Sequence, residues 1–385
     1  MSDIHARVVG PGGGSAPISR SARLSMTLSI YIAKHVLIGI VVALLALGVI
    51  AVVVDLIELL RRASNRPDAT FGVVFAMAWL HLPFFLQKLL PFAVLFGTMV
   101  SFQRLTRSHE LVAVRVVGVS VWQFLTPALG VVLALGVFMV TVFNPIGSVL
   151  VARYETLERL YFSYRASQVA VSSGGLWLRQ RDGDKELLLH ASQMKRSPPT
   201  LTNVTVFFYD DQMRFAARAD APTAELKPGY WLMRNPLYAK PDGSSKTEAT
   251  MQISTDLTAD RIQDSFEAPE TTSFWDLPDF IASLEAVGFS AREHRLYWHR
   301  LLALPTLLAA MLLIGATFSL RLVRRGGTGI LVTSGLLTGF AFYILSDVIF
   351  ALGLSGRLPP PLAAWTPAGI AILLGITTLL YLEDG

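Results

Sequence analysis

Side chains that could perform catalysis or bind a metal are scattered along this sequence. Six of its histidines show no pair at the spacing of one helix turn, which a metal site on a helix requires: His35, His81, His109, His190, His294 and His299. No glycine-rich loop ends in Gly-Lys-Ser or Gly-Lys-Thr, so the chain is not expected to hydrolyse ATP itself. The sequence therefore predicts neither an enzyme nor a cofactor site, and its chemistry should be non-covalent.

One short stretch carries a clear interaction pattern. Residues 107–118 are expected to form an amphipathic helix with a capping serine, an apolar face, a single acid and a terminating glycine. The residues concerned are Ser108, Glu110, Leu111, Arg115 and Gly118. Two interpretations remain open. The helix could anchor the chain at a membrane interface, or it could dock into a partner as a coupling helix, with Glu110 as its exposed charge.

Composition indicates what positions this helix. Of 385 residues, 52% are hydrophobic and 16% are charged, the mean hydropathy is +0.50, and there is no cysteine. Soluble domains carry roughly a quarter charged residues, so a soluble, disordered or disulfide-bonded chain is excluded. Of the 61 charged residues, 37 fall within residues 153–295, and the net charge of +5 comes from short loops elsewhere. That distribution is typical of a membrane protein and not of a nucleic-acid surface.

Six apolar stretches are predicted to cross a membrane, since about 20 apolar residues span the hydrocarbon core. The second should be tilted and kinked near Pro83 or Pro91, and the third should stop crossing near Pro145. The stretches are residues 36–54, 71–103, 116–152, 301–320, 328–346 and 358–382. Residues 1–24, rich in Gly, Ser, Pro and Arg, are expected to form a disordered cytoplasmic tail.

Between the third and fourth stretches, residues 153–297 have a different pattern. Apolar and polar residues alternate in short runs that turn sequences such as Pro241-Asp242-Gly243 separate. This predicts an all-β domain of the sandwich or jelly-roll kind. Residues 276–287 should add a helix, with Ser273 as its cap and Gly288 as its stop. The predicted fold is six transmembrane helices, grouped as residues 25–152 and 298–385, with a β domain inserted between helices three and four.

Basic residues indicate the orientation. The N-terminal tail and the second–third and fourth–fifth loops hold ten lysines and arginines: Arg7, Arg20, Arg23, Lys34, Arg104, Arg107, Arg115, Arg321, Arg324 and Arg325. The opposite loops hold four: Arg61, Arg62, Arg66 and Arg357. The positive-inside rule therefore predicts cytoplasmic termini and a β domain outside the cytoplasm. The cluster after the first span runs against this trend.

Several short motifs, in order along nearly the whole chain, resemble the LptF/LptG family of lipopolysaccharide export permeases. The clearest is Ser-His-Glu-Leu-Val followed by Gly-Val-Ser within residues 108–120, which is similar to the family's coupling helix. The others are Tyr31-Ile32, Asp55, Leu60-Arg61-Arg62-Ala63, Tyr164-Arg165-Ala166, Gly175-Leu176-Trp177 and Phe342-Tyr343-Ile344-Leu345. The Gly-Leu-Trp element and residues 273–288 resemble the LptG branch more than the LptF branch.

The resemblance implies an architecture and a set of partners. The family has three helices, a β jelly roll and three more helices in the bacterial inner membrane. It pairs one LptF-type with one LptG-type permease over a dimer of the LptB-type ATPase. Together with an LptC-type bitopic protein, it moves lipopolysaccharide out of the inner membrane and along the jelly rolls toward a periplasmic bridge.

The resemblance also implies a phosphate-binding role for the basic cluster. Arg61 and Arg62 match the paired basic residues that the family uses at the lipid–water boundary, and the arginine fork suits phosphate. The alternative is that both are ordinary interfacial anchors, whose charged ends reach from a helix end into water. Lys88 lies inside an apolar run, where a charge costs about 2.5–3.5 kcal/mol, so it should face a wet cavity, an anion or the interface. Arg153 is a further candidate for lipid phosphate.

Two acids depart from the family pattern, and two other functions compete. Asp55 stands where the family can carry a lysine, and Asp347 is one position away from the family's acid in the fifth span. A secondary transporter should show inverted repeats and paired charges within its spans, which the sequence does not show. A membrane-anchored periplasmic scaffold would explain the β domain but would leave the coupling helix without a role. The sister LptF-type role also stays open.

Overall fold

The computed structural model describes residues 26–384 with short gaps. The gaps are residues 65, 67, 109, 111–115, 117–119, 163–167, 173–174, 183–184, 197, 211, 213, 256, 259–261, 263–265, 267 and 320–327. The predicted tail, residues 1–24, lies outside the described residues.

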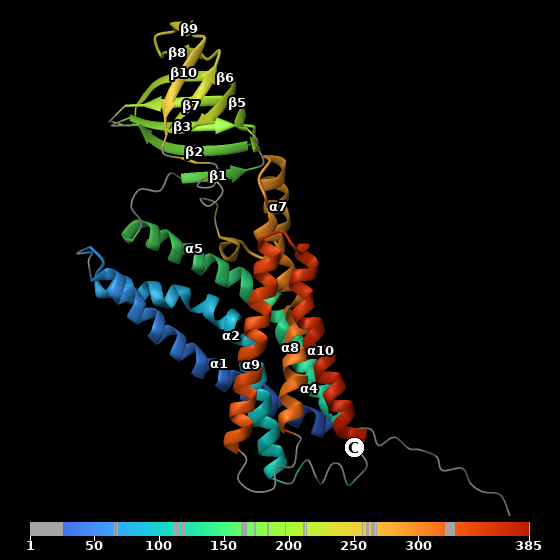
Figure 1. The fold of residues 1–385 in the computed structure, drawn as a ribbon. Coiled ribbons are helices and arrows are strands. Elements are labelled where there is room, and N and C mark those ends of the chain that lie inside the picture. The colour runs from blue at the N-terminus through green and yellow to red at the C-terminus, as the bar shows by residue number, and fades with distance from the viewer. Residues whose placement is uncertain are drawn as a thin grey trace, which may run out of the picture.

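Six of the described helical segments are long and apolar enough to cross a membrane, as the sequence predicted. They are α1 (Met26–Ala63), α2 (Phe71–Arg107), the continuous segment of α4 (Val121–Phe138), η1 (Met139–Phe143) and α5 (Asn144–Tyr161), then α8 (Arg292–Ser319), α9 (Thr328–Leu354) and α10 (Pro360–Asp384). Helix α2 is continuous through Pro83 and Pro91. It changes direction along its length, as expected for a helix that contains proline (Figure 1).

The helix that contains the third span continues past Pro145, and where the span leaves the membrane stays a prediction. A π-helical turn at Met139–Phe143 leads directly into α5, which continues to Tyr161. Proline has no N–H to donate to the carbonyl four residues earlier, which here belongs to Thr141. The indole Nε1 of Trp275 donates to that carbonyl at 3.1 Å. A partner from outside the helix therefore satisfies the group that Pro145 leaves unbonded, and the helix survives the proline.

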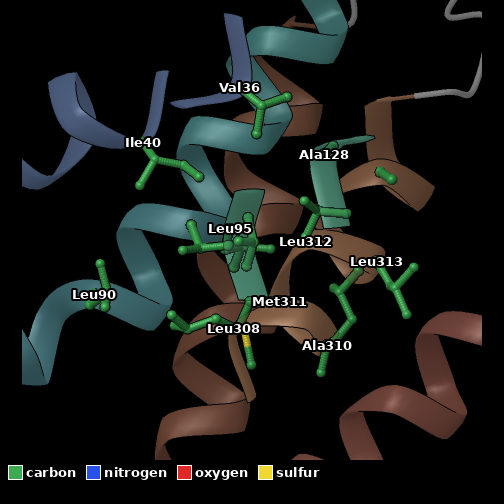
Figure 2. Close-up of a cluster of buried hydrophobic side chains, with 14 of the residues drawn as sticks. Val36, Ile40, Leu90, Leu95, Ala128, Leu308, Ala310, Met311, Leu312 and Leu313 are labelled. Atoms are coloured by element: carbon green, nitrogen blue, oxygen red, sulfur yellow. The ribbon is translucent and has the colours of Figure 1, made fainter. Parts of the chain in front are cut away.

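Helix α8 is the central element of the membrane part. Most of its apolar window is buried, whereas α1 and α9 bury little of theirs. Figure 2 shows Leu308 and Leu312 of α8 packed around Leu95 of α2, with Val36 and Ile40 of α1 nearby. Helices α1 and α2 approach to backbone contact, because a Cβ on Gly97 would lie 2.5 Å from the backbone of Ile40. Glycine at that position is what permits the approach.

The inserted domain is an antiparallel sheet at one end of the helical bundle (Figure 1). Its main path runs β1-β2-β3-β5-β6-β7-β10, while β4 pairs with β5, and β8 pairs with β6 and β9. The strands are β1 (Gln168–Ser172), β2 (Gly175–Asp182), β3 (Lys185–Ala191), β4 (Gln193–Arg196), β5 (Pro199–Tyr209), β6 (Phe215–Lys227), β7 (Tyr230–Arg234), β8 (Leu237–Ala239), β9 (Ser245–Thr247) and β10 (Thr250–Ser254). The prediction of an all-β insert is confirmed.

Alternating side chains build the core of this sheet. Leu176 and Leu178 on β2 face the same side as Leu187 and Leu189 on β3, and all four are buried. Helix α7 (Leu277–Ala286) covers this core with Leu284 and further apolar side chains. The two-residue period that predicted strands thus also identifies the buried face.

The predicted cap and stop of α7 hold in part. Its N-cap is Asp276 and not Ser273, whose hydroxyl donates to the Asp276 carboxylate at 2.5 Å. Gly288 ends the helix as predicted, with a φ of +95°. This left-handed conformation favours glycine. A Cβ at Gly288 would also collide with the carbonyl oxygen of Met194 on β4.

The segment that returns from the sheet is fastened to the third span. The side chain of Asn144 is 1% exposed. Its Oδ1 accepts a hydrogen bond from the Phe274 N–H at 2.8 Å, and its Nδ2 donates to the Tyr297 hydroxyl at 3.2 Å. One buried amide therefore joins three segments: the third span, the linker ahead of α7 and helix α8.

Candidate lipid-phosphate and coupling sites

Arg61 and Arg62 occupy the last turn of α1, where both share one carboxylate. The Nε and Nη2 of Arg61 donate to the two oxygens of Glu58 at 2.8 Å. The Nε of Arg62 donates to Glu58 Oε1 at 3.0 Å. This pairing follows from the helix, because residues three and four apart lie on one face. The two arginines are therefore partly neutralised, which the resemblance alone did not indicate.

A second carboxylate reaches the pair from another helix. Arg62 Nη1 donates to Glu158 Oε1 on α5 at 3.0 Å, which ties the end of α1 to the end of the third span. Glu158 was not among the predicted site residues, because residues 153–162 were expected to belong to the β domain, whereas α5 extends to Tyr161. A prediction that the third helix continues past Pro145 would have placed Glu158 near the end of α1.

The two arginines differ in how much of each remains available. The Arg61 side chain is 74% exposed, and the Arg62 side chain is 47% exposed. A guanidinium has five N–H donors in a planar fork, and Arg61 uses two of them on Glu58. Arg61 can therefore still present donors to a phosphate, whereas Arg62 serves as a link between α1 and α5.

Asp55 lies six residues before Arg61, or nearly two helical turns, and has its own partner. Both of its carboxylate oxygens are 3.3 Å from Nδ1 of His81 on α2. The His81 ring stacks on Tyr154 of α5, with centroids 4.2 Å apart and an interplanar angle of 9°. The departure from the family pattern at Asp55 is thus matched by an imidazole. We call Asp55, Glu58, Arg61, Arg62 and Glu158 the α1-end cluster.

The structure does not bring Lys88 into this cluster. The end of α1 packs on Val74, Met77 and Ala78, which precede Lys88 by at least ten residues, or roughly 15 Å along a helix. Lys88 is exposed to a separate cavity that Arg300 and Asp347 also line. Its ammonium group lies 5.5 Å from the centroid of the Phe84 ring. Lys88 thus lines a cavity, one of the three surroundings expected for it, and Arg300, for which no role was predicted, lines the same cavity.

The remaining phosphate candidate stands apart. Arg153, predicted to lie just past the third span, is exposed on α5, which continues beyond it to Tyr161. The described part of the chain therefore divides the four predicted phosphate-binding residues into the Arg61–Arg62 pair, Lys88 in its cavity, and Arg153. It contains no group of three or more His, Asp or Glu residues arranged to hold a metal ion.

The predicted coupling segment is described only in part. Ser108 ends α2, because its N–H donates to the Arg104 carbonyl at 3.0 Å and its hydroxyl to the Leu105 carbonyl at 3.2 Å. Glu110 is helical and exposed, and its carboxylate pairs by hydrogen bond with the Tyr31 side chain on α1. Three further predicted residues lie outside the described residues: Leu111, Arg115 and Gly118.

Comparison with known proteins agrees with this architecture. The family model described as "Lipopolysaccharide export system permease LptF/LptG" matches residues 30–381. The lipopolysaccharide export system permease protein LptG of Escherichia coli is 23% identical over 362 residues, which cover 91% of this chain and 97% of the relative. The protein of the same name from Haemophilus influenzae is 21% identical over 364 residues, which cover 90% and 96%.

The family match extends from the first span to the last and includes the inserted sheet. The matched residues contain six apolar helices and an antiparallel domain between the third and the fourth. They also contain the pair of arginines at the end of the first helix. This chain therefore belongs to the LptF/LptG family of lipopolysaccharide export permeases and is a multi-pass membrane protein.

Proposed function

We propose that the chain is the LptG-type permease subunit of an ABC exporter that extracts lipopolysaccharide from the inner membrane. Its partners would be an LptF-type sister permease, a dimer of an LptB-type ATPase and an LptC-type bitopic protein. The names of the two relatives support the cargo and the LptG branch. In this proposal the chain has no catalytic residue, and its work is binding, gating and the transmission of motion that ATP hydrolysis drives.

The surface of α1 is the observation that carries the proposal. A row of apolar side chains at helical spacing is exposed along it: Val42, Leu45, Val49, Val53 and Ile57, each between 49% and 63% exposed. Arg61 follows four residues later on the same face. An apolar stripe that ends in a cation is complementary to a lipid with acyl chains and a phosphate at its head.

Orientation within this proposal follows from charge. The excess of basic residues in the N-terminal tail and in the second–third and fourth–fifth loops supports cytoplasmic termini. The β domain would then be periplasmic, and the end of α1 would lie at the outer leaflet. Lipopolysaccharide phosphates in that leaflet would meet Arg61 at the height of the bilayer surface, since α1 is long enough to cross.

The test is a site-specific photo-crosslink in the purified complex. A photoreactive amino acid at Val49 should capture lipopolysaccharide, because this side chain is 63% exposed on the α1 stripe. The matched control is Leu373 on α10, which is 66% exposed but lies on another helix. Adducts at Val49 and not at Leu373, together with co-purification of the ATPase, are expected. Equal capture at both positions, or no ATPase, would contradict the proposal.

A further inference from the structure

Two carboxylates of the α1-end cluster contact its two arginines. Glu58 on α1 pairs with both Arg61 and Arg62, and Glu158 on α5 pairs with Arg62. At neutral pH the formal charges of these four side chains sum to zero, because two carboxylates face two guanidinium groups. A group without net charge attracts a phosphate only weakly, so strong phosphate binding requires one carboxylate to move away.

Glu58 opposes a phosphate at either edge of the Arg61 guanidinium group. Its two oxygens accept hydrogen bonds from Nε and Nη2 of Arg61 at 2.8 Å, so they occupy one of the two edges at which a guanidinium binds an oxyanion with two parallel bonds. A phosphate at the other edge would lie across the guanidinium group from this carboxylate and would be repelled by it. Removing the Glu58 charge should therefore strengthen phosphate binding at Arg61.

Arg62 gives Glu58 a second partner on the same helix. The Nε of Arg62 donates to Glu58 Oε1 at 3.0 Å, so Glu58 keeps this hydrogen bond when its bonds to Arg61 are broken. The Glu58 side chain is 38% exposed, which leaves it room to rotate. A carboxylate that passes from two arginines to one avoids the cost of an unpaired charge. Glu58 can therefore release Arg61 by rotation of side chains alone.

The other carboxylate is suited to a structural role. The ion pair of Glu158 with Arg62 joins two helices, so breaking it would separate the end of α1 from α5. The ion pair of Glu58 with Arg61 lies within α1 and joins nothing else. Arg61 is also the more exposed arginine, at 74% against 47% for Arg62. Displacing Glu58 from Arg61 is therefore the exchange that disturbs the helix packing least.

We propose that Glu58 is a competing carboxylate, which lowers the affinity of Arg61 for the lipopolysaccharide phosphate and promotes release of that phosphate. While the lipid is bound, the phosphate pairs with Arg61 and Glu58 pairs with Arg62. When the lipid leaves, Glu58 pairs with Arg61 again. A carrier needs such competition, because its site must bind the cargo strongly enough to capture it and weakly enough to let it leave. Glu58 is thus a positioning residue that acts through Arg61, and this inference rests on the proposed function.

The test measures the affinity and the dissociation rate of lipopolysaccharide with the assembled, purified complex. Glu58→Gln should bind about fivefold more tightly, the change that the loss of one exposed ion pair can produce, and the lipid should dissociate more slowly. The gain should be absent with enzymatically dephosphorylated lipopolysaccharide. It should also be absent when Glu58→Gln is combined with Arg61→Ala/Arg62→Ala, because the competing carboxylate acts through the arginines. A purely structural role for Glu58 would weaken binding and not strengthen it.

Two further variants complete the experiment. Asp68→Asn is the matched control, because it removes one exposed carboxylate from the loop after α1 and should leave the affinity unchanged. Glu58→Asp keeps the charge on a shorter side chain, so it should give a smaller gain, and it serves as the test if Glu58→Gln fails to assemble. Unchanged or weaker binding in the Glu58 variants, or an equal gain in Asp68→Asn, would overturn this inference alone. A wild-type complex that binds no lipopolysaccharide would instead overturn the proposed function, and this inference with it.

Discussion

Nδ1 of His81 lies 3.3 Å from each carboxylate oxygen of Asp55, and this contact joins α2 to the α1-end cluster. Both side chains are largely shielded, with exposures of 18% and 11%. An acid buried in a membrane helix requires a partner, and His81 is the one that the structure supplies. The pair accounts for the acid that replaces a lysine of the family pattern.

Removing this acid should loosen the first helical hairpin. A hydrogen bond to a charged group contributes about 1.5–3 kcal/mol, so Asp55→Asn should lower the melting temperature of the purified protein measurably. Asp68→Asn is the matched control, since Asp68 is exposed in the loop between α1 and α2. Equal melting temperatures for Asp55→Asn and wild type would show that the contact contributes nothing to stability.

Lipopolysaccharide binding should depend on the two arginines of the α1-end cluster. Arg61→Ala should weaken lipopolysaccharide binding about tenfold, because one charge-assisted contact contributes about 1.5–3 kcal/mol and 1.4 kcal/mol corresponds to a factor of ten. The double variant Arg61→Ala/Arg62→Ala should bind at least as weakly, and Arg357→Ala should bind like wild type. Binding is measured with the assembled, purified complex. If the double variant binds normally, both arginines are interfacial anchors.

Glu110 should affect the partner ATPase more than the fold. Glu110→Lys should weaken complex assembly or lipid-stimulated ATP turnover while membrane insertion is retained, because the exposed acid would no longer pair with a basic groove. Tyr31→Phe is the discriminating control, since it removes the hydrogen bond with Glu110 but keeps the charge. A loss in Tyr31→Phe as large as in Glu110→Lys would show that Glu110 acts through α1 and not through a partner.

Glu270 should give the protein a pH-dependent stability. Burial raises the pKa of this carboxyl above its ordinary value of 4.5, so the folded state binds the proton more tightly than the unfolded state does. The resulting stabilisation is complete below about pH 4.5 and is lost as the pH rises through the raised pKa. Melting temperatures between pH 4 and 8 should fall less steeply for Glu270→Gln than for wild type. Glu248→Gln, on the surface of the sheet domain, should leave the slope unchanged.

The β domain should fold on its own and should be more stable when α7 is included. Residues 166–290 should give a strand-dominated circular dichroism spectrum and a cooperative melt. The shorter fragment 166–270 lacks Leu284 and its neighbours, which cover the core of the sheet, so it should melt at a lower temperature. A mainly helical spectrum for the longer fragment would contradict the domain assignment.

Sequence patterns predicted the elements better than their ends. The six apolar stretches and the two-residue period identified the helices and strands, because burial in lipid or in a sheet selects apolar residues locally. The helices run beyond the predicted spans, since α1 and α5 continue into polar sequence, where apolar length gives no signal. At Pro145 the helix continues, and Trp275, 130 residues away, supplies a donor to the Thr141 carbonyl that no local pattern could predict.

The candidate sites were predictable only where neighbours in the sequence form them. Arg61 and Arg62 stand out because they are adjacent and run against the charge trend. Glu158 comes from another helix, and the cavity around Lys88 needs four helices, so no local pattern could place either. Arg300 was indistinguishable from an ordinary residue at the start of a membrane helix until the packing of α2, α8 and α9 was known.

The buried amide of Asn144 has a mechanical consequence. Asn144 bonds the linker ahead of α7 at the point where the third span passes from π to α geometry. The segment that returns from the sheet is therefore fixed to the third span by a hydrogen bond. The indole of Trp275 adds a second hydrogen bond between the linker and the third span, one turn away. A rotation of the third span about its own axis would therefore also rotate the linker ahead of α7 and the base of the β domain.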